Sequence, residues 1–143
     1  NARTPMQWDD SENAGFTDGT PWIKVNPNYK EINVKKALSD PNSIFHYYQK
    51  LIQLRKTYPV IVYGDYTLLE EEHDKIFAYL RTLEKDKLLV ISNWSNEEII
   101  FTMPERNQFE PFKVLIANYS DVNKEPCRLL KLRPWEAVVY LGK

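Results

Sequence analysis

Residues 75–93 have the sequence KIFAYLRTLEKDKLLVISN, in which two runs of strand-forming residues flank the polar tripeptide Glu84-Lys85-Asp86. The first run, 75–83, alternates apolar and polar side chains, and the second, 87–93, is rich in Leu, Val and Ile. A period of two indicates strands, and a short polar separator indicates the tight turn of a hairpin. The sequence therefore predicts an antiparallel β-hairpin in the second half of the chain.

Comparable runs lie on both sides of this hairpin. We predict further strands near residues 65–70, 97–102, 112–118, 127–132 and 135–141. Seven short strands at this spacing favour an antiparallel sandwich or barrel. The expected fold class is therefore mainly β, with a C-terminal antiparallel β-sandwich over residues 60–143 that is preceded by a loop region and one helix.

The helix is predicted at residues 42–58, where an apolar face recurs at helical spacing, and Pro59 ends it. Residues 1–41 are rich in Pro, Asn, Asp and Gly, which favours loops, with one short helical turn within 32–38. A lone helix with an apolar face must bury it against another element. It therefore packs either on the β-domain or on a partner that lies outside this chain.

Composition excludes several classes of function. The 143 residues are 43% hydrophobic and 27% charged, which is typical of a globular protein, and 19 basic against 20 acidic residues give a net charge of -1. This balance argues against a nucleic-acid-binding module, and no apolar run is long enough for a membrane span. We therefore expect no nucleic-acid or membrane partner. The single cysteine, Cys127, favours a reducing compartment, so we expect a cytoplasmic location.

The chain contains no complete catalytic motif. Asp9 and Asp10 are adjacent carboxylates, but chain neighbours rarely converge across a cleft, so we expect a turn or a cap there. The remaining reactive groups have no partners at catalytic or metal-ligand spacing. We therefore expect no cofactor and no metal, and structural or surface roles for the acidic triplet 70–72, His46, His73 and Cys127.

The most informative segment is Arg3-Thr4-Pro5-Met6-Gln7-Trp8-Asp9, in which an arginine precedes a proline-restricted stretch and a tryptophan. Two interpretations are open from the residues alone. Arg3 could form a structural ion pair beside a packed Trp8, or its rigid guanidinium fork could clamp a carboxylate or several hydroxyl groups of a ligand.

This heptapeptide resembles a characteristic segment of the α-glucosidases in the α-amylase family, glycoside hydrolase family thirteen, above all of its oligo-1,6-glucosidase group. Further segments resemble the family in the family's own order, and together they cover essentially the whole chain. They are Asn13-Ala14-Gly15-Phe16-Thr17 with Pro21-Trp22, Val25-Asn26-Pro27-Asn28-Tyr29 with Ile32-Asn33-Val34, Asp40-Pro41-Asn42-Ser43-Ile44-Phe45, Leu51-Ile52-Gln53-Leu54-Arg55-Lys56 and Gly64-Asp65-Tyr66.

The resemblance implies a division of the chain at residue 59. Residues 1–59 would be the last loop and helix of a (β/α)₈-barrel catalytic domain, and residues 60–143 the C-terminal β-sandwich. The family's catalytic carboxylates lie upstream of the heptapeptide, so no catalytic residue is expected here and the isolated chain should be inactive. The parent enzyme would be a retaining hydrolase of terminal α-1,6- or α-1,4-linked glucose in short oligosaccharides.

The same resemblance implies one substrate-binding residue, Arg3. The matching arginine of the family lies at the base of the pocket for the non-reducing-end glucose, where it binds hydroxyl groups and pairs with a barrel aspartate. The aromatic residues Trp8, Phe16 and Trp22 are expected to pack the loop rather than stack on sugar. The role of Gln7 stays open.

Two alternatives remain for the β-domain. One is an autonomous carbohydrate-binding module, which would use exposed aromatic side chains in a common plane. The other is a purely structural cap. Independently of both, we expect the isolated chain to self-associate through the helix face of Ile44, Leu51 and Ile52. The aromatic candidates for a binding platform are Tyr66, Tyr79, Trp94, Phe101, Tyr119, Trp135 and Tyr140.

Overall fold

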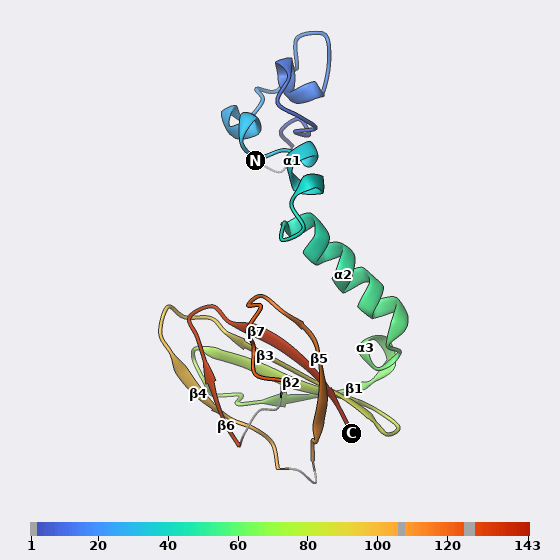
Figure 1. The fold of residues 1–143 in the computed structure, drawn as a ribbon, viewed down its shortest axis with the longest axis vertical. Coiled ribbons are helices and arrows are strands. Elements are labelled where there is room, and N and C mark those ends of the chain that lie inside the picture. The colour runs from blue at the N-terminus through green and yellow to red at the C-terminus, as the bar shows by residue number, and fades with distance from the viewer. Residues whose placement is uncertain (1–2, 106–107, 125–127) are drawn as a thin grey trace. The chain divides into compact units, whose positions relative to one another are not determined.

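The computed structural model describes residues 3–105, 108–124 and 128–143 of the chain (Figure 1). They form two compact units, Asn1–Ile52 and Gln53–Lys143, each of which is described by itself. The division falls inside a helix, a few residues before the sequence-based boundary at 59/60.

The first unit contains loops, two 3-10 turns and the helices that follow them. The turns are η1 (Glu12–Gly15) and η2 (Pro27–Lys30), and helix α1 spans Val34–Ser39, which confirms the expected helical turn. The side chain of Asn33 caps α1 by accepting a hydrogen bond from the backbone N–H of Lys36 at 2.9 Å. The longer α2, Ile44–Thr57, confirms the predicted helix and continues into the second unit.

The apolar face of α2 is exposed where it lies in the first unit. Ile44 is 78% exposed, Tyr48 62% and Ile52 53%. A helix face of this kind is normally covered in a folded protein. Among the described residues, no helix combines the length and the apolar character that crossing a bilayer requires.

The second unit contains all seven predicted strands, each within two residues of its expected bounds where the chain is described. They form a five-stranded antiparallel sheet in the order β1-β2-β3-β7-β5 and a two-stranded sheet. The two-stranded sheet consists of β4 and β6, and these two strands lie side by side in Figure 1. The strands are β1 (Asp65–Leu69), β2 (Ile76–Leu83), β3 (Asp86–Asn93), β4 (Ile99–Thr102), β5 (Pro111–Ala117), β6 (Leu129–Leu132) and β7 (Ala137–Gly142).

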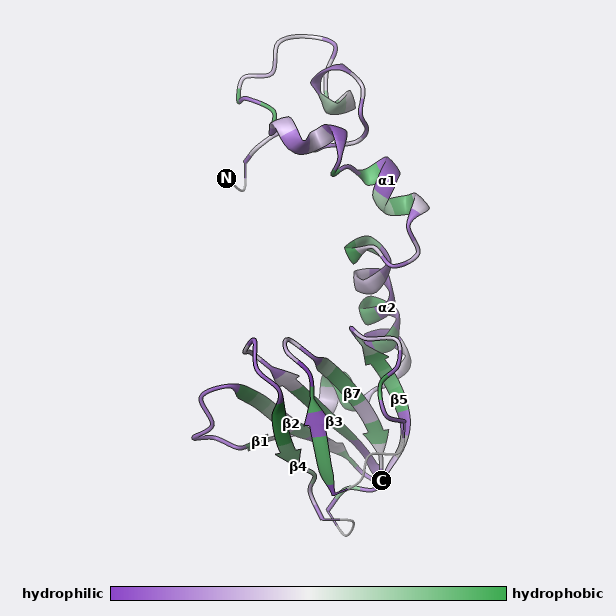
Figure 2. Ribbon diagram, turned by 60° about the vertical axis from the view of Figure 1, so that its left-hand side comes forward, coloured by the Kyte–Doolittle hydropathy of each residue, from purple (hydrophilic) through white to green (hydrophobic). Residues whose placement is uncertain are grey.

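The hairpin at residues 75–93 forms as predicted. Leu83 pairs with Asp86, so Glu84 and Lys85 make a two-residue loop, and Glu84 adopts a positive φ of 53°. Tight hairpin loops need positive φ because their twist must match that of the strands. The hydrophobic residues concentrate on the strands, while the connecting loops are mostly polar (Figure 2).

Alternation along the strands divides the apolar side chains between two faces of the large sheet. The inner face packs against the β4–β6 sheet, and the core between them holds twelve buried residues that include Leu89, Ile91 and the fully buried Tyr140. The outer face carries Leu88, Leu115 and Leu141. These pack under a short helix α3, Val60–Tyr63, which the sequence did not predict and which begins directly after Pro59. The sandwich expected from the sequence is therefore confirmed.

Candidate functional site around Arg3

Arg3 lies beside an exposed aromatic ring. Its guanidinium carbon is 5.5 Å from the centre of the Trp22 ring, within the range of a cation–π interaction, and Trp22 is 74% exposed. Arg3 itself is exposed. The first unit therefore presents a cation and a large aromatic surface together.

Gln7 fixes the segment that carries Arg3. Its side-chain amide donates hydrogen bonds to the Asn28 side chain at 3.0 Å and to the carbonyl of Ile32 at 2.6 Å. The Gln7 carbonyl accepts from the backbone N–H of Val34 at 2.9 Å. Gln7, whose role the sequence left open, thus ties this segment to the region of η2 and α1.

Asp9 forms a turn, as expected. One carboxylate oxygen accepts from the backbone N–H of Ser11 at 2.9 Å and also from the Ser11 hydroxyl. These two hydrogen bonds lower the pKa of Asp9. Asp10 instead forms an exposed ion pair with Lys35 at 3.6 Å. The two neighbouring carboxylates therefore have separate structural roles and do not form a catalytic pair.

Three consecutive residues next to this turn adopt left-handed backbone angles, which the sequence did not reveal. The φ values are 52° at Asn13, 61° at Ala14 and 64° at Gly15, and Ala14 is completely buried. For Ala this conformation is strained. The Ala14 carbonyl accepts from the backbone N–H groups of Trp8 and Asp9, at 2.9 and 3.3 Å, and thereby joins this strained corner to the Arg3 segment. Asn13 and Gly15, whose residue types adopt left-handed angles most readily, are the only sequence signals for this corner.

The aromatic residues Trp8, Phe16 and Trp22 are not packed as fully as the sequence suggested. Trp8 is 50% exposed, Phe16 42% and Trp22 74%. The unit buries small or polar residues instead, such as Ala14 and Asn33. The rings of Trp8, Phe16 and Trp22 therefore stay largely accessible.

The arrangement of Arg3 and Trp22 suits the binding of a ligand. A guanidinium beside an exposed indole can bind hydroxyl groups or a carboxylate and cover the apolar face of a sugar ring.

Among the residues that the structure describes, no three His, Cys, Asp or Glu side chains gather as they would to hold a metal ion. His46 and His73 make local contacts with backbone groups, which agrees with structural roles. Cys127 lies outside the described residues.

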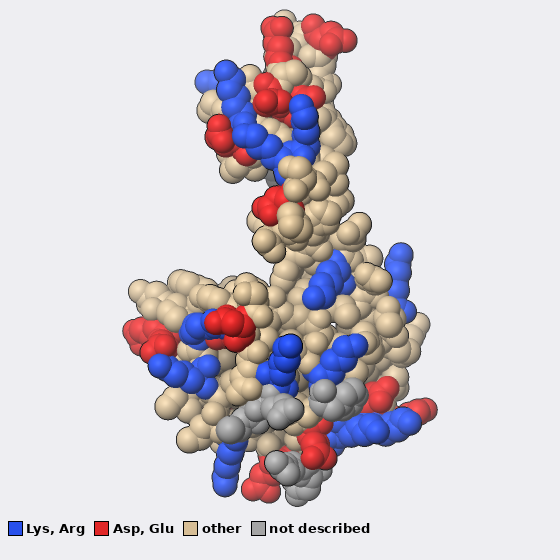
Figure 3. Space-filling model, in the orientation of Figure 1, with Lys and Arg blue, Asp and Glu red and all other residues tan. Residues whose placement is uncertain are grey.

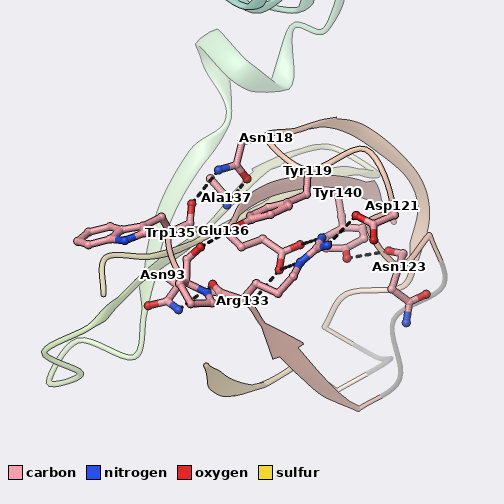
Figure 4. A network of polar contacts seen from close by, with 11 residues as sticks. Asn93, Asn118, Tyr119, Asp121, Asn123, Arg133, Trp135, Glu136, Ala137 and Tyr140 are labelled. Carbon is pink, nitrogen blue, oxygen red and sulfur yellow. Dashed lines mark hydrogen bonds and ion pairs between the residues drawn. The ribbon is translucent and has the colours of Figure 1, made fainter. Parts of the chain in front are cut away.

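A second polar cluster, which sequence analysis missed, lies in the β-domain (Figure 4). Arg133 donates to both carboxylate oxygens of the buried Glu136, at 3.1 and 2.8 Å, and to Asp121 at 2.6 Å. Its guanidinium also stacks on Tyr119 at 3.8 Å from the ring centre. Because each charged group has partners, this cluster is a clamp between the 118–123 segment and the turn before β7.

Tyr140, in the same region, has a raised pKa. Burial, together with the charge of Glu136, raises the pKa of Tyr140 to about 12. The Tyr140 hydroxyl donates to the carbonyl of Asn123 at 2.9 Å, so it remains a neutral donor that fixes the same segment. The i, i+3 spacing of Arg133 and Glu136 was the one signal for this cluster in the sequence.

Comparison with known proteins gives two family matches. Residues 1–64 match "Alpha amylase, catalytic domain", and residues 76–139 match "Alpha-amylase SusG C-terminal domain". Oligo-1,6-glucosidase from Parageobacillus thermoglucosidasius is 59% identical over 98% of this chain, and trehalose-6-phosphate hydrolase from Bacillus subtilis is 46% identical over 98%. The chain spans about a quarter of the length of each relative, 25% in both cases.

Solved structures agree with these matches. The crystal structure of trehalose-6-phosphate hydrolase from Bacillus licheniformis superimposes with a TM-score of 0.91 at 46% identity, covering 100% of this chain and 26% of that one. The expectation from the heptapeptide and the segments that follow it is therefore confirmed. Over nearly its whole length, the chain is similar to the C-terminal part of oligo-1,6-glucosidases, and its two segments match models of α-amylase domains.

Proposed function

We propose that this chain is the C-terminal part of a retaining α-glucosidase that removes terminal α-1,6- or α-1,4-linked glucose from short oligosaccharides. The observation that carries the proposal is 59% identity to an oligo-1,6-glucosidase along 98% of the chain. In such a reaction one carboxylate attacks the anomeric carbon, a carboxylic acid protonates the leaving oxygen, and water completes a second displacement. The preceding catalytic domain supplies these groups, and the enzyme works in the cytoplasm.

Arg3 is the substrate-binding residue of this chain in the proposal. Its guanidinium binds hydroxyl groups of the non-reducing-end glucose and pairs with an aspartate of the catalytic domain. The proximity of the Trp22 ring and the anchoring of its segment through Gln7 support this role, because both restrict the guanidinium before substrate arrives. Residues 1–59 complete the barrel in this proposal, and residues 60–143 form the terminal domain.

A chimera tests the proposal. In it, this chain replaces the matching quarter of the Parageobacillus thermoglucosidasius oligo-1,6-glucosidase. We expect hydrolysis of isomaltose and of 4-nitrophenyl α-glucoside by the chimera and none by the isolated chain. Arg3→Ala should reduce kcat/KM by several orders of magnitude, because breaking a buried charged pair costs about 3–5 kcal/mol. Lys24→Ala, an exposed cation of the same loop region, is the matched control. Near-normal kcat/KM in Arg3→Ala refutes the role of Arg3, and turnover by the isolated chain refutes the division of labour.

A groove in the β-domain favours the alternative of a carbohydrate-binding module. Trp94, which is 67% exposed, and Phe77, which is 45% exposed, line a groove of about 460 Å³ together with His73 and Asp74. The Trp94 indole N–H donates to the Ser92 hydroxyl at 2.9 Å, which restricts the ring although Trp94 stays exposed. Millimolar binding of isomaltotriose to the isolated chain, lost in Trp94→Ala and kept in Trp135→Ala, is the result that this alternative requires.

A further inference from the structure

The exposed ring of Trp22 needs an anchor to stay beside Arg3. The guanidinium carbon of Arg3 lies 5.5 Å from the centre of the Trp22 ring, but Trp22 is 74% exposed. A side chain that buries so little surface gains little from packing, and a cation–π contact at an exposed site is weak. The place of the ring therefore depends on how the backbone before it is held.

The side chain of Asn13 holds that backbone. Its amide donates hydrogen bonds to the carbonyl of Thr17 at 3.2 Å and to the carbonyl of Gly19 at 3.0 Å. The backbone N–H of Gly19 in turn donates to the Thr17 hydroxyl at 3.1 Å, which closes a small turn. Asn13 thus fixes the chain at two points shortly before Trp22.

The connection from this turn to Trp22 is short and stiff. Only Thr20 and Pro21 lie between Gly19 and Trp22. Proline locks its own φ and also restricts the residue before it, so neither connecting residue moves freely. The position of Gly19 therefore largely sets the position of Trp22. We call residues 17–22 the tryptophan loop.

The left-handed corner that contains Asn13 also holds the segment of Arg3. The carbonyl of the buried Ala14 accepts from the backbone N–H groups of Trp8 and Asp9, at 2.9 and 3.3 Å. Asn13 directly precedes Ala14 in the chain. Neighbouring groups of one corner therefore bind the Arg3 segment on one side and the tryptophan loop on the other.

The backbone of the corner restricts which residue can make this link. Asn13 has a φ of 52°, and Asn, Asp and Gly are among the residues that adopt such an angle most readily. Of these three, only Asn has a side chain that donates hydrogen bonds, and its amide has two hydrogens for the two carbonyls. Asparagine thus satisfies the left-handed backbone and both hydrogen bonds together.

We propose that Asn13 is a positioning residue of the sugar site, whose amide holds Trp22 against Arg3 through the tryptophan loop. The inference rests on the proposed function in that Arg3 binds the terminal glucose of an α-glucoside. Asn13 does not contact the sugar. It acts only through Trp22, which in turn limits the motion of the guanidinium before substrate arrives.

Fluorine NMR of the chain labelled with 5-fluorotryptophan tests this link without any turnover. The chain has four tryptophans, whose signals single Trp-to-Phe variants assign. Asn13→Asp and Asn13→Gly both tolerate the left-handed angle and both lack the amide donor. We expect each to shift the Trp22 signal in the same direction as Arg3→Ala does, because the ring and the guanidinium separate in all three variants. An unchanged Trp22 signal in both Asn13 variants overturns the proposal.

Two controls separate this link from general loosening of the region. Asn26→Asp adds the same charge where the side-chain oxygen accepts from the backbone N–H of Asn28, at 3.2 Å, so Asp can replace Asn there and the Trp22 signal should stay in place. Trp8 is bound to the corner through its backbone N–H and should keep its signal in the Asn13 variants. An equal shift of the Trp22 signal in Asn26→Asp, or an equal displacement of the Trp8 signal, shows a folding effect and overturns the proposal.

Kinetics of the chimera test the consequence for the sugar site. Asn13→Gly should lower kcat/KM about two- to fivefold, which corresponds to the loss of a cation–π contact at an exposed site. It should have no further effect when Trp22→Ala is already present. Asn26→Asp should retain the kcat/KM of the unmodified chimera. Additive losses for Asn13→Gly and Trp22→Ala overturn the proposal, because Asn13 would then act by a route other than Trp22.

Failure of the proposed function and failure of this inference give different results. A chimera that is inactive with this chain unmodified refutes the proposed function, while the fluorine signals still decide whether Asn13 holds Trp22. A displaced Trp22 signal with unchanged kcat/KM in Asn13→Gly overturns the positioning role and leaves the proposed function standing.

Discussion

Arg133 and Glu136 form a two-point ion pair in which the carboxylate is 4% exposed and the guanidinium lies partly at the surface. The backbone N–H of Arg133 also donates to Glu136, at 2.8 Å. This arrangement closes the turn before β7, where Trp135 adopts a positive φ of 58°. A charge buried to this degree is stable only while its partner is present.

Arg133→Ala should therefore destabilise the β-domain strongly. We expect a loss of about 2–3 kcal/mol in the free energy of unfolding, because the variant leaves a buried carboxylate without its charged donor. Lys131→Ala, which removes an exposed ion pair with Glu98, should cost less than about 1 kcal/mol. Urea unfolding of both variants measures the difference, and similar midpoints would contradict the clamp.

The same pair gives a pH dependence of stability. Burial alone raises the pKa of Glu136, but the hydrogen bonds and charge of Arg133 outweigh it, so the pKa in the folded protein lies below the ordinary value of 4.5. The fold thus favours the carboxylate. Its contribution to stability is complete above about pH 4.5 and is lost as the pH falls through the lower, folded pKa. The Tm of the wild type should drop below pH 4.5.

Glu136→Gln serves as the control for this acid transition. The variant should be less stable than the wild type at pH 7, with a smaller fall in Tm between pH 5 and pH 3. Asp121, whose pKa the Arg133 hydrogen bond lowers, titrates in the same direction and accounts for part of the remaining slope. A Tm profile in Glu136→Gln that parallels the wild type would assign the acid sensitivity to other groups.

The fold was largely predictable because local patterns determined it. The period-two runs at 75–83 and 87–93 and the short polar loop between them admit few structures other than a hairpin. Helix α3 has no separate signal in the sequence, because Pro59, which ends the pattern of α2, is also the N-cap of this four-residue helix.

The candidate site was less predictable, because its parts come together through tertiary contacts. The contact of Arg3 with Trp22 and the Arg133 contact with Asp121 join residues separated along the chain. The left-handed Ala14 has no sequence signal, since its strained angles are held by the hydrogen bonds that its own carbonyl accepts from Trp8 and Asp9. On the faces visible in Figure 3, acidic and basic side chains are interspersed and mark no site.

The left-handed corner at Asn13, Ala14 and Gly15 leads to a further prediction. A Cβ at Gly15 would lie 2.8 Å from a carboxylate oxygen of Asp9, and the φ of +64° disfavours any side chain. Gly15→Ala should therefore open the corner and speed amide hydrogen exchange at Trp8 and Asp9. Gly19→Ala, whose Cβ would meet only the Thr17 hydroxyl at 3.8 Å, is the control. Equal exchange in the two variants would show that the corner does not hold the Arg3 segment.

The exposed helix face predicts self-association of the isolated chain. Sedimentation velocity should show concentration-dependent oligomers, because apolar side chains such as Ile44 and Ile52 gain from leaving water. The double variant Ile44→Asp/Ile52→Asp should be a monomer at the same concentration. A variant with aspartate at two polar positions of α2, Gln49 and Gln53, controls for added charge. A monomeric wild-type chain would contradict this expectation.

Trp22 should influence catalysis through Arg3. A cation–π contact at an exposed site contributes about 0.5–1 kcal/mol, so Trp22→Ala in the chimera should lower kcat/KM about two- to fivefold. Trp22→Phe keeps an aromatic face and should recover most of the loss. In the Arg3→Ala background, Trp22→Ala should have no further effect if the ring acts only by holding the guanidinium. Fully additive effects of the two substitutions would show that Trp22 contacts the sugar itself.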